Sequence, residues 1–122
     1  MPFQSFKDLA VWQHARDLAV EVYRITAEGR LSKDFGLKDQ MQRAAVSVPS
    51  NIAEGHDRTT DKEFIRYLDI SSGSIAELRT QLEIAQKIGY ITSDSFSSID
   101  DTCCKIGAML NKLKQARRAR IG

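Results

Sequence analysis

Apolar residues recur every three or four positions along most of this chain, and this spacing constrains the fold more than any other feature. It places the apolar side chains on one face of an α-helix, whereas a half-buried strand would alternate at every second residue. Only two prolines and seven glycines occur in 122 residues, which favours long helices. Four helices are predicted, over residues 6–28, from 35 or 36 to 54, from 60 to 88, and from 92 or 93 into the basic carboxyl-terminal stretch.

Signals for helix ends lie at the borders of these segments. Gly29, Gly55 and Gly89 each follow a last apolar turn, where glycine readily adopts the left-handed conformation that ends a helix. Thr60 and Glu63 have the spacing of a capping box, in which each side chain satisfies a free backbone amide of the other. The predicted boundaries therefore rest on backbone chemistry as well as on periodicity.

Amphipathic helices joined by short links pack most simply as an antiparallel up-down-up-down four-helix bundle. We therefore predict an all-α protein with a single domain over residues 1–122 and a basic tail over about 114–122. Pro49 lies inside the second helix, and its ring should kink that helix. The hairpin of the second and third helices is expected to bring Gly73 close to Ala44.

Composition is that of an ordinary globular protein, with 42% hydrophobic and 28% charged residues. No apolar run approaches the 18 or so residues of a membrane span, and the first seven residues lack the pattern of a signal peptide. The adjacent Cys103 and Cys104 cannot close an unstrained disulfide loop. These features predict a cytoplasmic protein with no membrane partner.

The first two helices carry more apolar surface than one small core can use. Beside its core stripe, the first helix has a second apolar sector, and in the second helix Val46, Pro49 and Ala53 lie away from the stripe. Large apolar patches usually meet a partner, so we predict a homo-oligomer with Trp12, Tyr23 and Val46 at or near the interface. The alternative is a set of scattered exposed hydrophobic residues, which are common on protein surfaces.

A row of polar residues flanks the apolar stripe of the second helix, and the third helix offers Glu77 opposite it. One interpretation is a buried hydrogen-bonded network, in the core or between subunits, because buried polar groups must be satisfied. The alternative is a solvated face. The residues of this predicted network are Gln40, Arg43, Ser47, Asn51, Glu54 and Glu77.

Charge is distributed unevenly along the chain. Residues 105–122 carry six basic residues and no acid, while the whole chain has a net charge of +2. Such a basic end predicts contact with RNA or DNA, although it also complements the dipole of a helix that ends there. The predicted nucleic-acid-binding residues are Lys112, Lys114, Arg117, Arg118 and Arg120.

Enzymatic motifs are not found in the sequence. His14 and His56 lie far apart and neither is part of a Glu-x-x-His pair, which a di-iron bundle would need. No phosphate-binding glycine loop occurs, and the two cysteines lack zinc-like spacing. We therefore expect no catalytic residues, no metal and no cofactor.

Several of these residues also carry a family resemblance. The motifs are Phe6-x-x-Leu9-x-Val11-Trp12-Gln13 and the central stretch Phe35-Gly36-Leu37-x-x-Gln40-x-x-Arg43-Ala44-Ala45-Val46-Ser47-Val48-Pro49-Ser50-Asn51-Ile52-Ala53-Glu54-Gly55. With them the chain resembles the four-helix-bundle proteins encoded by intervening sequences of bacterial large-subunit ribosomal RNA genes, over roughly residues 5–113.

The resemblance implies a ring-like homopentamer without established enzymatic activity. The chain is similar too to the accessory protein of diversity-generating retroelements, a basic pentamer that works with a reverse transcriptase and nucleic acid. The resemblance and the basic end together predict a nucleic-acid-binding accessory protein, with a nucleic-acid-processing protein as a further partner. The alternative is an oligomeric scaffold that binds a protein partner.

Overall fold

The computed structural model describes residues 5–121 and consists of four α-helices in this range. Two short 3₁₀ segments, η1 (Phe6–Asp8) and η2 (Gly29–Lys33), precede the first and second helices. The predicted all-α class is confirmed. The helices are α1 (Ala10–Thr26), α2 (Phe35–His56), α3 (Asp61–Lys87) and α4 (Ser93–Ile121).

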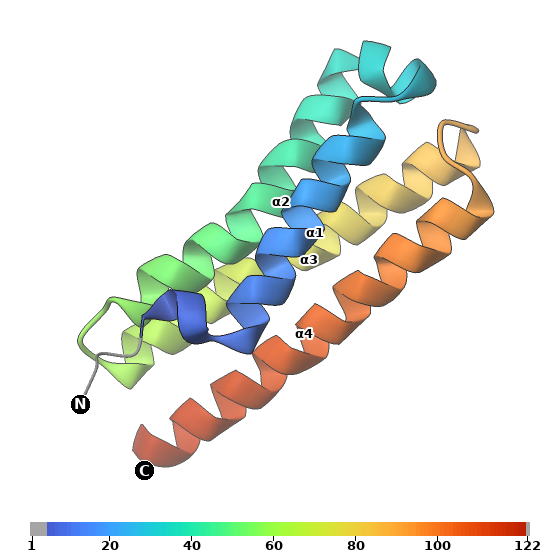
Figure 1. Ribbon diagram of the computed structural model, residues 1–122. Coiled ribbons are helices and arrows are strands. Elements are labelled where there is room, and N and C mark those ends of the chain that lie inside the picture. Colours follow the sequence, from blue (N-terminus) through green and yellow to red (C-terminus); the bar gives the residue numbers. More distant parts are fainter. Residues whose placement is uncertain (1–4, 122) are drawn as a thin grey trace.

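Successive helices run in opposite directions, which is the predicted up-down-up-down arrangement (Figure 1). Each helix packs on its neighbours in the chain, and α1 also packs on α4. The start of α1, the α2–α3 turn and the end of α4 therefore lie at the same end of the bundle. Among the described residues, no helix combines the length and apolar character needed to cross a membrane.

The buried core is built from the predicted apolar stripes. Leu18 of α1, Met41 of α2, Leu78 of α3 and Ile106 of α4 are examples, each fully or almost fully buried. Removing such a side chain from water contributes about 1.5–3 kcal/mol. Because all four helices supply a stripe, the core runs along the length of the bundle.

The first helix differs from its prediction at the amino-terminal end. Leu9 has an extended backbone, with φ −73° and ψ 125°, and separates η1 from α1. Ser5 and Asp8 form a capping box on η1, so this short segment satisfies its own amides. The predicted helix over residues 6–28 is therefore a 3₁₀ turn followed by α1.

The sequence predicted that Gly55 ends the second helix, and this prediction is wrong. Gly55 lies inside α2, which continues to His56, and it is buried. A Cβ atom at this position would lie 2.6 Å from the Tyr67 Cβ and 2.9 Å from the Phe64 Cδ1. Glycine is needed here because α3 approaches closely. Gly29 and Gly89 have positive φ, of 56° and 83°, where left-handed conformations were predicted.

The predicted close approach at Gly73 is wrong. A Cβ atom at Gly73 would meet nothing within 4 Å, and the residue is exposed. Instead, Ser74 bonds to Ser47, with their hydroxyl oxygens 2.8 Å apart. The register of the hairpin is therefore shifted by nearly one turn from the predicted one. Helix α2 continues through Pro49, and a kink there stays a prediction.

Candidate functional site: the α1/α2 groove and the basic end of α4

An apolar groove runs along the outer side of α1 and α2. It has a volume of about 510 Å³ and is lined almost entirely by apolar surface. The α1 residues recur at helical spacing, so they share one face of that helix. The groove residues are Phe6, Trp12, Arg16, Ala19, Val20, Tyr23, Val46, Pro49, Ser50 and Ala53.

Trp12 is held in place by two neighbours at one end of this groove. The Phe6 ring meets it edge-on, with centroids 5.2 Å apart. The Arg16 guanidinium lies 5.2 Å from the centre of the indole ring, a favourable arrangement for a cation and an aromatic face. Trp12 is half-buried and lines the groove, and its two neighbours order the ring.

The middle of the groove is open to water. Val20, Tyr23 and Val46 are 45%, 48% and 40% exposed. The structure thus brings together Trp12, Tyr23 and Val46, the three residues that the sequence predicted for an interface. The contributions of Phe6 and Arg16 were not predicted, because the break at Leu9 that folds η1 against α1 leaves no mark in the apolar periodicity.

Polar residues of the predicted network line an adjoining hollow, together with Tyr23 and Val46. Asn51 Nδ2 donates to the Ser47 carbonyl and hydroxyl oxygens at 2.8 and 3.0 Å. The Ser47 hydroxyl also bonds to that of Ser74 in α3. Half-buried Ser47 and Asn51 therefore form a small hydrogen-bonded cluster that joins α2 to α3.

The other members of the predicted network are not in the core. Gln40, Arg43, Glu54 and Glu77 are exposed in the chain. Glu54 pairs with Arg58, one turn along, at 3.1 Å, while no hydrogen bond or ion pair joins Arg43 to Glu77 within residues 5–121. Burial inside one subunit is thus excluded for Arg43 and Glu77, because both point outward. Their burial between subunits stays a prediction.

At the basic end of α4, three of the five predicted nucleic-acid-binding residues are tied to α3. Lys114 is only 8% exposed, and its Nζ lies 3.0 Å from both Asp69 Oδ1 and Ser72 Oγ. Arg117 and Arg120 both reach Asp61, at 2.9 and 3.2 Å.

These ties give three of the predicted residues partners inside the chain, and their contact with nucleic acid stays a prediction. Arg117 also lies over the Phe64 ring, 4.7 Å from its centre, and is half-buried. Lys114, Arg117 and Arg120 therefore fasten α4 to α3, and two carboxylates, those of Asp61 and Asp69, counter part of their charge. Lys112 and Arg118 remain exposed and make no ion pair within residues 5–121.

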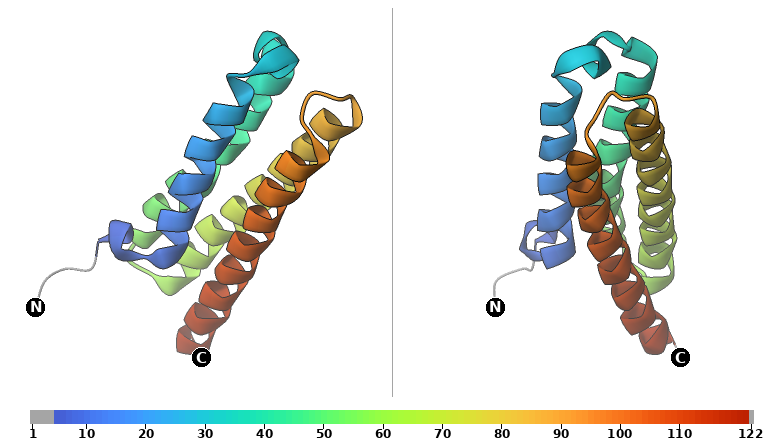
Figure 2. Two further views of the ribbon diagram at one scale, coloured as in Figure 1. Left: turned by 45° about the vertical axis from the view of Figure 1, so that its right-hand side comes forward. Right: turned by 90° about the vertical axis from the view of Figure 1, so that its right-hand side faces the viewer.

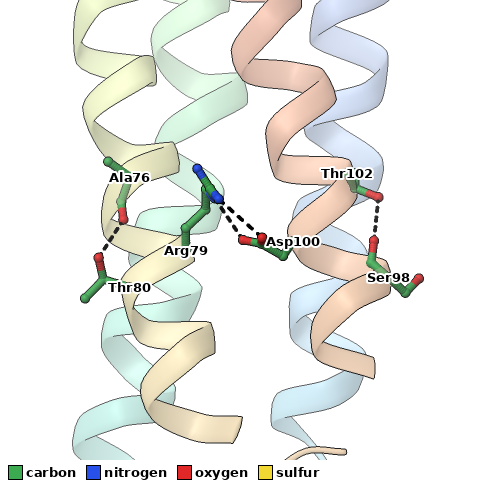
Figure 3. Close-up of polar contacts among 6 residues, drawn as sticks. All are labelled: Ala76, Arg79, Thr80, Ser98, Asp100 and Thr102. Carbon is green, nitrogen blue, oxygen red and sulfur yellow. Dashed lines mark hydrogen bonds and ion pairs between the residues drawn. The ribbon is translucent and has the colours of Figure 1, made fainter. Parts of the chain in front are cut away.

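The outer side of α3 holds a second hollow, next to α4. Arg79 makes two bonds to Asp100 of α4, at 2.8 and 3.3 Å (Figure 3). This pairing raises the pKa of Arg79, mainly through the hydrogen bond to Asp100. The hollow is also lined by Ala76, Thr80, Glu83, Ile84, Lys87 and Ile88.

The cysteines and histidines form no shared centre. Burial raises the pKa of the Cys103 thiol to about 12, so it is neutral at physiological pH and a poor nucleophile. His56 packs edge-on against Phe64, and His14 is exposed on α1. No group of three metal-ligating side chains occurs among the described residues.

A family model matches almost the whole chain. The model is described as 23S rRNA-intervening sequence protein, and it covers residues 7–112. No curated protein matches the sequence.

A solved structure has a similar fold. It is a protein of unknown function from the S23 ribosomal protein family of Bacteroides thetaiotaomicron. The two sequences are 24% identical, the match covers 86% of this chain and 98% of the other, and the TM-score is 0.79. This likeness supports the bundle architecture and carries no activity with it.

Proposed function

The chain belongs to the 23S rRNA-intervening sequence protein family, whose model spans most of its length, and from this premise we propose that it is a non-enzymatic homo-oligomeric bundle. The assembly acts as a scaffold whose subunits associate through the α1/α2 groove. We place it in the cytoplasm, because its neighbouring cysteines are both free and suit a reducing compartment.

The observation that carries this proposal is the open middle of the groove. Three apolar side chains, Val20, Tyr23 and Val46, are each at least 40% exposed on one continuous surface. Covering such a surface lowers the free energy by about 25 cal/mol for each Å² removed from water. Aromatic side chains in a preformed hollow are also the usual anchors of protein interfaces.

The proposed number of subunits is five, which rests on the resemblance to ring-forming bundle proteins. Subunits of 13.7 kDa would then give a particle of about 68 kDa. Light scattering during gel filtration at micromolar concentration measures this mass directly. A mass near that of one chain would overturn the proposal, and another multiple would change only the number.

A matched pair of variants connects the assembly to the groove. Tyr23→Glu places a charge in the middle of the groove, so the mass should fall to that of one chain. Ile121→Glu places the same charge on a residue of α4 that is 56% exposed and lies outside the groove, so the assembly should persist. Equal behaviour of the two variants would contradict the role of the groove.

A second candidate function, nucleic-acid binding, is supported by the exposed bases of α4. Residues 105–122 have a charge of +6, and Asp61 and Asp69 of α3 offset part of it. Five copies in one particle would still present on the order of 20 positive charges, and linked weak sites gain avidity. Binding should be tolerant of sequence and weaken steeply with salt, because neutralised phosphates release counterions.

The test uses variants that leave the ion pairs to α3 in place. Labelled RNA and DNA, single- and double-stranded, are titrated at several salt concentrations with the wild type, Lys112→Ala and Arg118→Ala. Each variant should lower the slope of log affinity against log salt by about one for each chain in contact with the strand. Lys33→Ala, at the other end of the bundle, should leave the slope unchanged. Absence of binding by the wild type at low salt would remove this function.

A further inference from the structure

A strip of four residues, three on α3 and the last directly after its end, forms the second exposed apolar surface of the bundle. Ala76, Thr80, Ile84 and Ile88 follow one another at intervals of four, and all are exposed and line the same hollow. Ile84 and Ile88 are 47% and 49% exposed. Such an i, i+4 row is the ridge that packs into grooves on other helices. We call these four residues the α3 strip.

The single hydroxyl of the α3 strip does not oppose burial. Thr80 Oγ1 donates to the Ala76 carbonyl at 2.9 Å, within the same helix (Figure 3). This bond survives when the surface is covered, so the hydroxyl loses no partner. The neighbouring Arg79 is likewise occupied by Asp100 of α4. Covering the strip therefore breaks neither of these hydrogen bonds.

The strip and the groove lie on different helix pairs, so both can be covered at once. The groove is lined by η1, α1 and α2, and the hollow beside the strip by α3 and Asp100 of α4. In the upper part of the left view of Figure 2, α1 and α2 lie on one side of the bundle and α3 and α4 on the other. Within one chain, therefore, the strip cannot fill the groove.

We propose that the α3 strip of one copy docks along the α1/α2 groove of the next copy and the hollow that continues it, so that the chain assembles head to tail. This inference rests on the proposed self-association and names the two surfaces that meet. Contacts between unlike surfaces close into rings when the rotation between copies is suitable. A dimer joining groove to groove would instead leave Ile84 and Ile88 of both copies in water.

Charges beside the two surfaces fit this arrangement. Asp39 and Arg43 line the hollow that continues the groove, one turn apart on α2. Glu83 and Lys87 flank the strip, one turn apart on α3. All four are exposed, and none makes an ion pair within residues 5–121.

The direction of the helices brings opposite charges together. Helices α2 and α3 are antiparallel in one chain (Figure 1), and rotation about an axis along the bundle preserves the direction of every helix. For a ring axis that runs along the bundle, α3 of one copy therefore also runs antiparallel to α2 of the next copy. Arg43 then meets Glu83, and Asp39 meets Lys87, because each pair is reversed relative to the other. In this register Thr80 lies opposite Val46 of the groove, and Ile84 lies opposite Gln42 in the hollow that continues it.

Mixing two blocked variants tests the head-to-tail contact. Val46→Glu closes the groove and keeps the strip, and Ile84→Glu closes the strip and keeps the groove. Each variant alone should have the mass of one chain, and an equimolar mixture should give a particle of about 27 kDa, because one intact contact remains. Ile121→Glu, on α4 and outside both surfaces, should retain the mass of the wild type.

Each other outcome identifies what has failed. Unchanged assembly of Ile84→Glu would overturn the role of the strip while leaving the groove and the self-association intact. A mixture that stays monomeric would overturn the head-to-tail contact. A monomeric wild type would overturn the proposed function itself.

A charge exchange gives a second test that does not depend on the apolar residues. Arg43→Glu and Glu83→Arg should each raise the concentration needed for half-assembly about tenfold or more, as expected for a close pair across an interface. The double variant should recover most of the loss, because the pair is restored with reversed sign. Failure to recover would contradict the pairing of Arg43 with Glu83, since a groove-to-groove dimer would pair Arg43 with Asp39.

Discussion

The α1/α2 groove and the basic end of α4 differ in how far their side chains are exposed to water. In the groove, Val20 and Tyr23 are apolar and remain about half exposed. At the end of α4, Lys114 is charged and almost completely buried. The apolar surface is thus left open while much of the charge is already countered.

Side-chain length explains this difference. A valine on the outer face of a helix cannot turn into the core, because its direction is fixed by the backbone. Lysine and arginine have long flexible stems that lie along apolar surface while their ends reach a partner. Lys114 and Arg117 do this, reaching Asp69 and Asp61 of α3. Periodicity therefore locates exposed apolar surface well, whereas counting charges overestimates how many are free.

The largest expected effect comes from breaking the groove at its ordered end. Trp12→Glu replaces the ring held by Phe6 and Arg16 with a charge that would have to be buried on assembly. Removal of such an aromatic anchor typically costs 2 kcal/mol or more of binding free energy, so the dissociation constant should rise at least about thirtyfold. Sedimentation velocity over a range of concentrations measures this change.

A measurement of helix content distinguishes loss of the contact between subunits from loss of the fold. Circular dichroism of Trp12→Glu should show the same helix content as the wild type, because Trp12 is only half-buried. Retained assembly of a folded Trp12→Glu would remove this residue from the interface and shift the contact toward Tyr23 and Val46.

The second-largest effect is expected when the buried charge of Lys114, near the end of α4, is removed. Lys114→Ala removes the bonds to Asp69 and Ser72 and should lower the free energy of unfolding by about 1–2 kcal/mol. The estimate lies below that for a fully buried pair, because the Asp69 side chain is 56% exposed and stays hydrated. Urea denaturation followed by circular dichroism measures the change.

Lys112→Ala is the matched control for this comparison. Lys112 lies two residues away on the same helix but is exposed, so its removal should leave the stability almost unchanged. In nucleic-acid titrations the order should reverse, with Lys112→Ala weakening binding and Lys114→Ala leaving it unchanged. Equal losses of stability for the two variants would contradict the structural role of Lys114.

Most of the fold was predictable because it depends on local patterns. The sequence predicts the four apolar stripes, the helix cap at Thr60 and the helix ends at Gly29 and Gly89. The predicted helix boundaries lie within one or two helical turns of the observed ones. Gly55 was misassigned because a glycine at a helix end and a glycine at a close contact look alike in sequence. Only the distance to Tyr67 in α3 separates the two roles.

The candidate site was predictable where it depends on helix faces and not where it depends on neighbours. Trp12, Tyr23 and Val46 share one groove because each lies in a predictable sector of its helix. The partners of Lys114 and Arg117 lie 42 to 56 residues away in the chain. Their contacts depend on the register of α4 against α3, which the spacing of apolar residues does not define to within one turn.

The smallest expected effect tests a charge that lies beside the groove. Arg43 was predicted to be buried, in the core or between subunits, and the chain shows it exposed on α2. Arg43→Ala should therefore change the free energy of unfolding of a single subunit by less than about 1 kcal/mol, as for other exposed charges. The measurement is made in the Trp12→Glu background, at a protein concentration below its raised dissociation constant, so that contacts between subunits do not contribute.

The same substitution in the wild-type background gives the contrast. There Arg43 faces Glu83 of the next copy in the proposed contact, so Arg43→Ala should weaken assembly while leaving the single subunit as stable as before. A loss above about 3 kcal/mol in the Trp12→Glu background would instead be typical of a broken buried pair and would return Arg43 to the core network. A small loss of unfolding free energy in the Trp12→Glu background, together with weaker assembly in the wild-type background, would show that Arg43 makes its contact between subunits. Only a contact that is absent from the isolated chain can weaken assembly without changing the stability of that chain.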